Sequence, residues 1–353
     1  MLLSGGGSAG TPSASPTPSS TPVPSPTVSA SPTASPTPSP TSGPVACPLN
    51  GVPVPSLPPE GEPALIVQIE NHPLARPTRN LTNADIVIEA TVEGDVTRFS
   101  AVFYCQPTIG LSGPIRSARY YNLDLWQEFH GLTVHFGGSY QALRRFKAAG
   151  MRTMNGITGA WPYFRRYGTA PAPHNLWGDL QALRAATLAN PAARSLAQAA
   201  GTLRPPFEVE ADPQLPDGTP VNTVTMRTNS YWTFSWRWDA DLDAWRRSDG
   251  GSPDTDAATG KPITATSVVV QRITESTVYT DPDPAGNPRR DLHLVGSGTG
   301  ALYVNGSAIA VRWSRPSASA LTTWTYADGS PMVLPPGPIW WELVPVTGAV
   351  TNS

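Results

Sequence analysis

Lysine, cysteine and long apolar runs are all scarce in this chain of 353 residues. Two of its 24 basic residues are lysines, Lys147 and Lys261, and the formal net charge is only −2. Without a strong positive charge, nothing in the composition favours nucleic acid as a partner. No apolar run reaches the roughly 18 residues that a membrane-spanning helix needs, so we expect a globular body outside the bilayer.

Charged side chains are also missing from the start of the chain, where Glu60 is the first. Residues 8–44 are nearly all Ser, Thr, Pro, Ala, Gly and Val, which cannot bury enough apolar surface to offset the entropy of ordering. We therefore predict a disordered tether over residues 1–46, biased towards extended polyproline II. Such stalks are typical of exported proteins, so we expect an extracytoplasmic, cell-envelope location, anchored or secreted. A cytosolic protein with a disordered tail is the alternative.

The two cysteines are Cys47, where the globular region begins, and Cys105, at the end of a predicted strand. In an oxidising compartment they can form a disulfide that fastens the start of the body to the sheet. The alternative is two unrelated thiols. No spacing of cysteine and histidine matches a metal site, and we predict neither a metal nor a cofactor.

Predicted strands and helices alternate from Cys47 to about residue 205, which is typical of an α/β domain with a mixed sheet and flanking helices. The expected strands are residues 64–69, 85–90, 98–104 and 132–136, with a hairpin turn at 93–97. The expected helices are residues 120–129, 140–149 and 179–200. Gly150 follows the second helix as a C-terminal stop signal.

Helical periodicity ends at Pro205 and Pro206, so we predict a mainly-β domain over residues 206–353. Its short strands are expected at residues 221–227, 231–238, 267–273, 291–295, 301–304, 309–313 and 340–344. The sequence Asn305-Gly306 is a strong hairpin signal between two of them. The chain thus reads as a tether (1–46), a ligand-site domain (47–205) and a β domain (206–353).

The polar residues of the first domain gather at predicted strand ends, where open α/β sheets bind ligands. Clustered arginines favour phosphate or carboxylate, because the planar guanidinium group binds both in a bidentate manner. The alternative is that these arginines form structural ion pairs with Glu70, Glu89, Glu93 and Asp124. The predicted ligand-binding residues are Asn71, Arg76, Glu93, Arg98, Arg116, Ser117, Arg119, Gly137, Gly138, Ser139 and Asn175.

The turn Gly137-Gly138-Ser139 precedes a predicted helix, so its backbone N–H groups and the helix dipole form a possible anion cradle. Ser139 is best interpreted as the N-cap of that helix. A catalytic alternative makes Ser139 a nucleophile with His135 or His174 as base and Asp124 as orienter. An enzyme acting on a glycan would instead use Glu70, Glu89 or Asp124 as base.

A set of motifs spans most of the chain after the tether, at residues 47–51, 69–73, 75–77, 84–89, 93–99, 113–119, 135–139, 173–176, 268–271 and 294–300. Together these motifs resemble the YerB-type family of bacterial lipoproteins, a two-part domain of unknown function. The resemblance implies tethering to the envelope through a lipid-modified cysteine. No such cysteine stands near Met1, and we interpret the first seven residues as the remnant of a signal or anchor.

A strand followed by a polar loop, then Gly-Pro-Ile-Arg-Ser at 113–117 and a Gly-Gly helix start, is loosely similar to the LytR-CpsA-Psr phosphotransferases. That resemblance implies a glycan phosphotransferase, although Ser117 stands where the family has an aspartate. Our main hypothesis is binding of an anionic envelope ligand or glycan by the arginine-rich site. The alternatives are a phosphotransferase or hydrolase and a purely structural scaffold.

Overall fold

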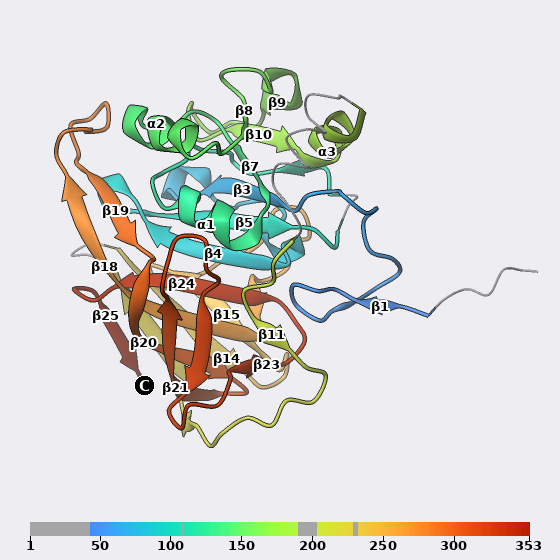
Figure 1. The fold of residues 1–353 in the computed structure, drawn as a ribbon, viewed down its shortest axis with the longest axis vertical. Helices are drawn as coiled ribbons and strands as arrows, with labels where there is room; N and C mark the ends of the chain where they lie inside the picture. Colours follow the sequence, from blue (N-terminus) through green and yellow to red (C-terminus); the bar gives the residue numbers. More distant parts are fainter. Residues whose placement is uncertain (1–42, 107–108, 190–202, 229–231) are drawn as a thin grey trace, which may run out of the picture. The chain divides into compact units, whose positions relative to one another are not determined.

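A 12-stranded sheet, ordered β12-β21-β20-β18-β24-β4-β5-β3-β7-β8 with β19 and β22 attached, contains strands from both halves of the chain (Figure 1). The computed structural model describes residues 43–106, 109–189, 203–228 and 232–353. Most of the predicted tether, residues 1–42, lies outside the described residues. The last part of it does not, because Val45–Ala46 form strand β1 and pair with β2 (Pro53–Val54).

The N-terminal half supplies one end of this sheet, close to the predicted positions. Its strands are β3 (Leu65–Glu70), β4 (Ile86–Thr91), β5 (Thr97–Phe103), β7 (Leu132–His135) and β8 (Thr153–Asn155). β4 and β5 form the expected antiparallel hairpin, and β3 pairs antiparallel with β5 but parallel with β7. This part of the sheet is therefore mixed, as the sequence predicts.

The C-terminal half completes the same sheet rather than forming a separate one. Strand β24 (Ile339–Pro345) lies between β4 and β18 (Ser267–Val278) and is parallel to both. The sheet then continues through β20 (Gly296–Val304), β21 (Ser307–Arg315) and β12 (Thr219–Pro220), with β19 (Arg289–His293) and β22 (Thr323–Tyr326) attached. The two sequence halves thus share a backbone hydrogen-bonding network.

Besides the β1–β2 pair, the described residues form three smaller sheets around the large one. The largest is six-stranded and antiparallel: β13 (Thr223–Arg227), β14 (Thr233–Asp239), β15 (Ala244–Asp249), β16 (Ser252–Pro253), β17 (Thr264–Ala265) and β25 (Ala349–Asn352). The others are β6 (Leu111–Ser112) with β9 (Phe164–Arg166) and β10 (Leu176–Asp179), and β11 (Glu208–Val209) with β23 (Val333–Leu334).

The described residues contain three α-helices, all in the first half: α1 (Asn122–Phe129), α2 (Tyr140–Ala148) and α3 (Leu180–Ala189). α3 was expected to extend to residue 200, but residues 190–202 lie outside the described part. Residues 203–228 and 232–353 hold strands and turns without an α-helix, as predicted for a mainly-β half. Within the described chain, no helix combines the length and apolarity needed to cross a membrane.

Side chains alternate between the two faces of the large sheet and give it two apolar cores. On one face Ile88 packs with Leu125 and Phe129 of α1. On the other face Phe99 packs with Trp236 of the six-stranded sheet. Because both faces are covered, the strands of the N-terminal half read as continuous apolar runs rather than as alternating ones.

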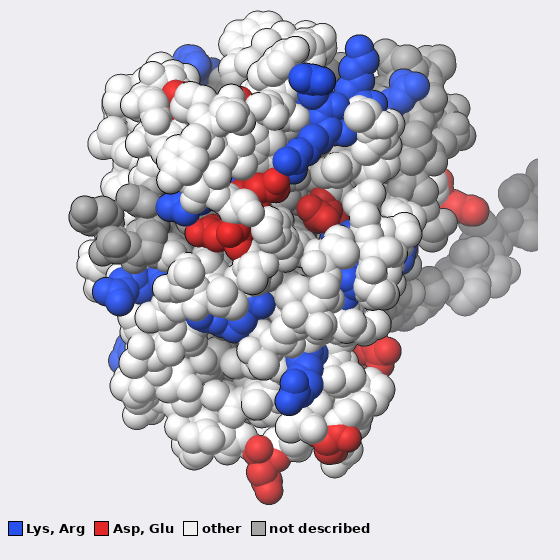
Figure 2. Space-filling view, turned by 60° about the vertical axis from the view of Figure 1, so that its left-hand side comes forward, with Lys and Arg blue, Asp and Glu red and all other residues white. Residues whose placement is uncertain are grey.

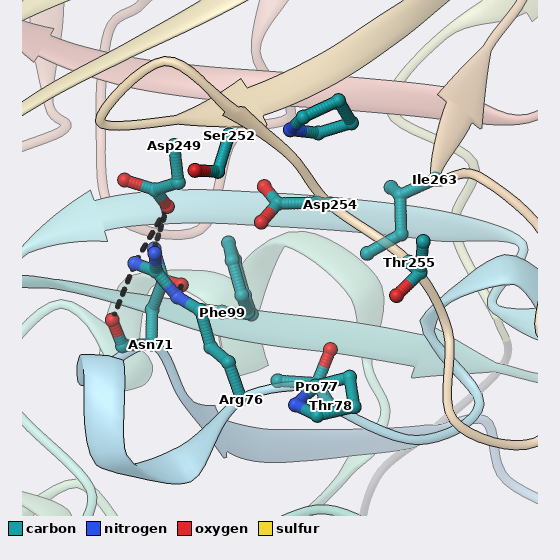
Figure 3. Close-up of a pocket in the computed structure, with 11 residues that line it drawn as sticks. Asn71, Arg76, Pro77, Thr78, Phe99, Asp249, Ser252, Asp254, Thr255 and Ile263 are labelled. Carbon is teal, nitrogen blue, oxygen red and sulfur yellow. Dashed lines mark hydrogen bonds and ion pairs between the residues drawn. The ribbon is translucent and has the colours of Figure 1, made fainter.

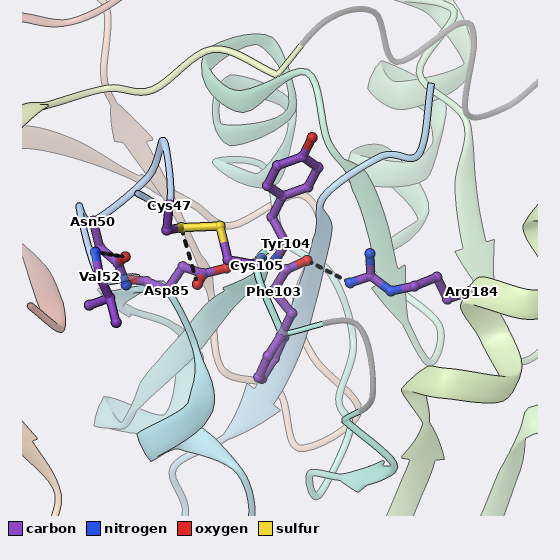
Figure 4. Close-up of a disulfide and its surroundings, with 8 residues drawn as sticks. All are labelled: Cys47, Asn50, Val52, Asp85, Phe103, Tyr104, Cys105 and Arg184. Carbon is purple, nitrogen blue, oxygen red and sulfur yellow. Dashed lines mark hydrogen bonds between the residues drawn. A yellow bond between two sulfur atoms is a disulfide. The ribbon is translucent and has the colours of Figure 1, made fainter. Parts of the chain in front are cut away.

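Cys47 and Cys105 form a disulfide, which joins the first folded residues to the end of β5 (Figure 4). The buried carboxylate of Asp85 lies beside it and accepts hydrogen bonds from the backbone N–H groups of Tyr104 and Cys105, at 2.6 and 3.0 Å. Burial raises the pKa of Asp85 to about 6. The disulfide closes a loop with a sequence separation of 58.

Replacing both cysteines by alanine should lower the unfolding free energy by about 4 kcal/mol, because the open chain gains conformational entropy when unfolded. Urea denaturation of the oxidised protein and of the double variant measures the difference. The wild-type protein under a thiol reductant is the control and should approach the variant. Equal stability of the oxidised protein and the variant would contradict the expectation.

Candidate functional site

Polar side chains collect at one edge of the large sheet, where parallel strands end. β24, β4, β3 and β7 run in the same direction, so their carboxyl ends lie along a common edge. Glu70 and His135 are the last residues of β3 and β7, and Asn71 follows β3 directly. The polar residues that the sequence places at the ends of these predicted strands thus lie at one edge of the sheet.

The centre of this edge is a buried group of charges that we call the inter-sheet ion cluster: Glu89, Arg247, Asp249, Asp254 and Glu342. The Arg247 guanidinium group comes from β15 and contacts both carboxylate oxygens of Glu89 at 2.8 Å. It also contacts Asp249 at 2.9 Å and pairs with Asp254. The side chain of Arg247 is 0% exposed, so its guanidinium group is enclosed between the two sheets, whereas Asp254 is partly exposed.

Strand register explains why carboxylates accumulate there. β24 and β4 are parallel, and Glu342 lies opposite Glu89 on the face that meets the six-stranded sheet. Burial, followed by the charge of Glu89, raises the pKa of Glu342 well above its ordinary value. Burial raises the pKa of Glu89 to about 7, although Arg247 opposes that effect. Glu342 also accepts a hydrogen bond from the indole of Trp236 at 2.9 Å.

Asn71 connects the ion cluster to solvent. Its amide nitrogen donates to Thr97, Glu89 and Asp249, at 2.7, 3.2 and 3.3 Å. Its oxygen and backbone carbonyl accept from Arg76, which also forms an ion pair with Asp249 at 2.6 Å. These contacts fix the guanidinium group of Arg76 against the ion cluster, while part of its side chain remains exposed to solvent.

A second polar group surrounds Glu70. Its carboxylate lies 2.9 Å from the Nε atom of Arg116 and 3.1 Å from Nδ1 of His174. The ring of His174 is stacked on that of His72, with ring centroids 4.4 Å apart. Burial lowers the pKa of His72, and the positive charges of His174, Arg116 and Arg76 lower it further, whereas Glu70 raises it.

The remaining predicted charges serve as structural contacts. Arg119 and Arg289 both pair with Glu93, and Asp124 pairs with Arg315 at 3.1 Å. Arg98 is buried, and its guanidinium group donates to the backbone carbonyl of Ser117 at 2.7 Å.

The Gly137–Ser139 turn is already occupied by protein groups. The N–H group of Gly137 donates to Asn155, and the hydroxyl of Ser139 accepts from the N–H group of Ala142 as the N-cap of α2. The predicted cap is confirmed, whereas the anion cradle would have to displace these bonds. Gly138 forms a parallel bridge to Ala118, and Asn175 accepts a hydrogen bond from Arg166.

His135 is fully buried beneath this turn. Its Nδ1 lies 2.6 Å from the carbonyl oxygen of Gly137, and its Nε2 lies 2.8 Å from the hydroxyl of Thr153. A neutral ring satisfies both contacts by donating from Nδ1 and accepting at Nε2. Burial lowers the pKa of His135 to about 4. The residue is positioned to support the turn and does not reach a ligand.

The four arginines of the predicted site do not converge on one hollow. Arg98 and Arg119 are buried, Arg116 is paired with Glu70, and Arg76 lines the two cavities described below. Of the five catalytic candidates, only Glu70 and His174 meet; Glu89, Asp124 and His135 are engaged elsewhere. The structural alternative therefore describes most of these charges, because buried guanidinium groups need their own carboxylates.

Two cavities meet at Arg76 and Pro77, which line both. The first, which we call the aspartate pocket, has a volume of about 260 Å³ and lies against the ion cluster (Figure 3). Its remaining lining residues are Asn71, Thr78, Phe99, Asp249, Ser252, Pro253, Asp254, Thr255 and Ile263. Figure 3 shows the side chains of the β15–β17 segment facing those of residues 71–78 across the cavity.

The second cavity, which we call the arginine pocket, has a volume of about 380 Å³. Its basic lining residues are Arg76, Arg79 and His174, and none of the described residues that line it carries a carboxylate. Tyr167 and Trp177 supply aromatic surface. Two of these basic side chains contact carboxylates behind the lining, because Arg76 pairs with Asp249 and His174 contacts Glu70. On the face that Figure 2 shows, basic side chains likewise lie next to acidic ones, although several gather at its upper right.

Sequence reasoning missed Arg79, Tyr167 and Trp177, and it missed Arg247 and Glu342 of the ion cluster. Arg247 stands in β15 between the polar residues Arg246 and Ser248, as many exposed strand residues do. The local sequence therefore does not indicate that its side chain is buried. The sequence does contain a signal for Arg79, because it stands three residues after Arg76, which the prediction included.

Comparison with known proteins matches both halves of the chain. The family model "Protein of unknown function (DUF3048) N-terminal domain" matches residues 49–193, and the corresponding C-terminal domain matches residues 222–341. The chain is 29% identical over 315 residues to "Putative lipoprotein YerB" of Bacillus subtilis (strain 168), covering 87% of this chain and 88% of that protein. A crystal structure of YerB protein from Bacillus subtilis superposes with a TM-score of 0.70 at 26% identity, covering 87% of this chain and 99% of that one.

Replacing Arg247 by methionine should lower the unfolding free energy by about 3–5 kcal/mol, because it leaves buried carboxylates without their cation. The double variant Glu89→Gln/Arg247→Met should recover part of that loss, since it removes one of those charges as well. Urea denaturation of both variants checks this. Additive losses would show that the two side chains are not coupled.

The buried His135 should make the protein less stable as the pH falls from about 6.5 to about 4. In this window the unfolded chain takes up a proton at His135 that the folded chain cannot hold, because its folded pKa is about 4. His135→Asn keeps a donor for Gly137 and does not titrate. The stability difference between wild type and His135→Asn should shift in favour of the variant across this window. A difference independent of pH would contradict the expectation.

Proposed function

The chain belongs to the DUF3048 family, whose function is unknown, and we propose that it binds a phosphate or carboxylate group of a cell-envelope ligand in the arginine pocket. The observation that carries this proposal is the lining of that pocket, which has two arginines and a histidine without an opposing carboxylate among the described lining residues. Guanidinium groups bind such anions through paired, charge-assisted hydrogen bonds. The site keeps Arg76 and His174 from the sequence-based set and adds Arg79.

Basic N–H groups that face the pocket support an anion. Burial lowers the pKa of the neighbouring His72, and Arg116 and Arg76 contribute to this while Glu70 opposes it. Arg79 donates one hydrogen bond to the carbonyl oxygen of Ala257 at 3.2 Å, which leaves most of its N–H groups for a ligand. Tyr167 and Trp177 provide apolar surface next to these charges, as ligand pockets typically do.

An extracytoplasmic location agrees with the relative's name, which describes YerB as a lipoprotein. We propose that this chain is likewise attached to, or secreted into, the cell envelope, with the Ser/Thr/Pro-rich segment as its spacer. The disulfide supports this, because disulfides persist in oxidising compartments. The proposed ligand is accordingly a component of the envelope rather than a cytosolic metabolite or a nucleic acid.

A hydrolase or phosphotransferase acting on an envelope glycan is the second candidate. One contact favours it: Glu70 lies 3.1 Å from His174, whose ring lines the arginine pocket. A carboxylate in that position orients a histidine for proton transfer. Glu70→Gln would then abolish turnover of a lipid-linked glycan while leaving anion binding in place. If the Glu70→Gln variant keeps both turnover and anion binding, this candidate function is ruled out.

Inorganic phosphate should bind the full chain saturably, and Arg79→Gln should weaken that binding about tenfold, because one charge-assisted contact is lost. Isothermal titration calorimetry measures both affinities. Arg144→Gln is the matched control, since Arg144 is exposed on α2 and lines neither pocket. Equal weakening by both variants, or no saturable binding, would contradict the proposal.

A further inference from the structure

We infer that the aspartate pocket receives a polyhydroxylated ring, so that the ligand is a glycan carrying an anionic substituent. This inference rests on the proposed function for its anionic part and names the chemistry of the remainder. The starting point is continuity: Arg76 and Pro77 line both cavities, so a ligand anchored in one reaches into the other. Together the cavities reach the ~300–1,000 Å³ that is typical of ligand sites.

The carboxylates of the aspartate pocket are held in ion pairs. Asp249 and Asp254 line it, and each is paired with an arginine: Asp249 with Arg76 and Arg247, and Asp254 with Arg247. Because Arg247 also pairs with Glu89, the lining keeps an excess of acceptors and disfavours a free anion. It does present fixed acceptors and a fixed donor at close range, which suits a neutral ligand rich in hydroxyl groups.

Hydroxyl groups complete the wall. Ser252 and Thr255 are exposed and line the pocket, and within the described chain neither hydroxyl is hydrogen-bonded to another protein group. Each can donate one hydrogen bond and accept others, as sugar hydroxyls also do. Thr78 lies on the opposite wall, so donors and acceptors face the cavity from both sides (Figure 3).

Proline rings supply the accessible apolar part. Pro77 and Pro253 are exposed and line the cavity, whereas Phe99 lies beneath it, only 2% exposed and covered by the Arg247 guanidinium group at 5.2 Å. A sugar ring has hydroxyl groups around its rim and C–H groups on its faces, so it matches polar walls with apolar surface between them. The aspartate pocket, at about 260 Å³, is small enough to select a single ring rather than a chain.

Arg76 fixes the distance between the two parts of the ligand. Its guanidinium group is held by Asn71 at 2.9–3.0 Å and by Asp249 at 2.6 Å, so it cannot swing away from the boundary. The anionic group would lie on its Arg79 side and the ring on its Asp249 side. A sugar with a phosphate or carboxylate directly attached satisfies both positions.

Calorimetry with a matched set of ligands tests the inference on the full chain. The set is inorganic phosphate, cyclohexyl phosphate, the 1-phosphates of glucose, galactose, mannose and N-acetylglucosamine, and neutral methyl glucoside. Cyclohexyl phosphate has a ring without hydroxyl groups, so it separates hydroxyl recognition from simple burial of a ring. At least one sugar phosphate should bind about tenfold more tightly than cyclohexyl phosphate.

Two variants localise the effect. Thr255→Val keeps the shape of the side chain but removes its hydroxyl, and Ser252→Ala removes the other exposed hydroxyl. Both should reduce the preference for the sugar phosphate several-fold while leaving the affinity for inorganic phosphate unchanged. Arg79→Gln should weaken all phosphates alike and leave the preference intact.

The outcomes distinguish this inference from the proposed function. If phosphate binds but no sugar phosphate exceeds cyclohexyl phosphate, or if Thr255→Val and Ser252→Ala leave the preference unchanged, the polyol pocket is overturned and anion binding stands. If phosphate does not bind but methyl glucoside does, with loss in Thr255→Val, the anion site fails and the polyol pocket stands. If neither phosphate nor methyl glucoside binds, both are overturned.

Discussion

The contact between Arg247 and Glu89 is the constraint on which the rest of the structure depends. It joins a strand of the C-terminal half to a strand of the N-terminal half, 158 residues apart, in the interior between two sheets. Burying these groups is costly, and the mutual attraction offsets the cost only when the geometry is maintained. The two sheets are therefore held in one relative position, because sliding either would separate the charges.

The candidate binding surface inherits its geometry from this contact. Asn71 touches Glu89 and Asp249 on one side and Arg76 on the other, so it transmits the position of the ion cluster to the boundary between the pockets. A buried polar network of this kind fixes a single arrangement when its members are satisfied. The outward-facing Arg76 is thereby preorganised, which reduces the entropy that a ligand must overcome on binding.

The sequence predicted what local patterns control. The apolar run at 64–69, the hairpin signals at 93–97 and 305–306, and the Ser139 cap each depend on neighbouring residues, and each appears in the structure. The ion-pair partners of Arg76 and Glu89 could not be predicted from the sequence. These partners, Asp249 and Arg247, come from a distant strand whose sequence pattern is that of a half-exposed strand. The arginine pocket was missed for a similar reason: Arg79, Tyr167 and Trp177 are brought together only by tertiary packing. The sequence-based site and the arginine pocket share Arg76 and His174, but most of their side chains differ.

The position of β24 in the sheet has a consequence for how the protein is made. This strand separates β4 from β18, yet it is assembled from residues 339–345 of a chain of 353. While the ribosome or the export machinery still holds the C-terminus, the N-terminal half has an open strand edge with unpaired N–H and C=O groups, a template for wrong pairing. Folding to the final topology must therefore wait until residues 339–345 are available, and any product cut short before residue 339 would leave that edge uncovered.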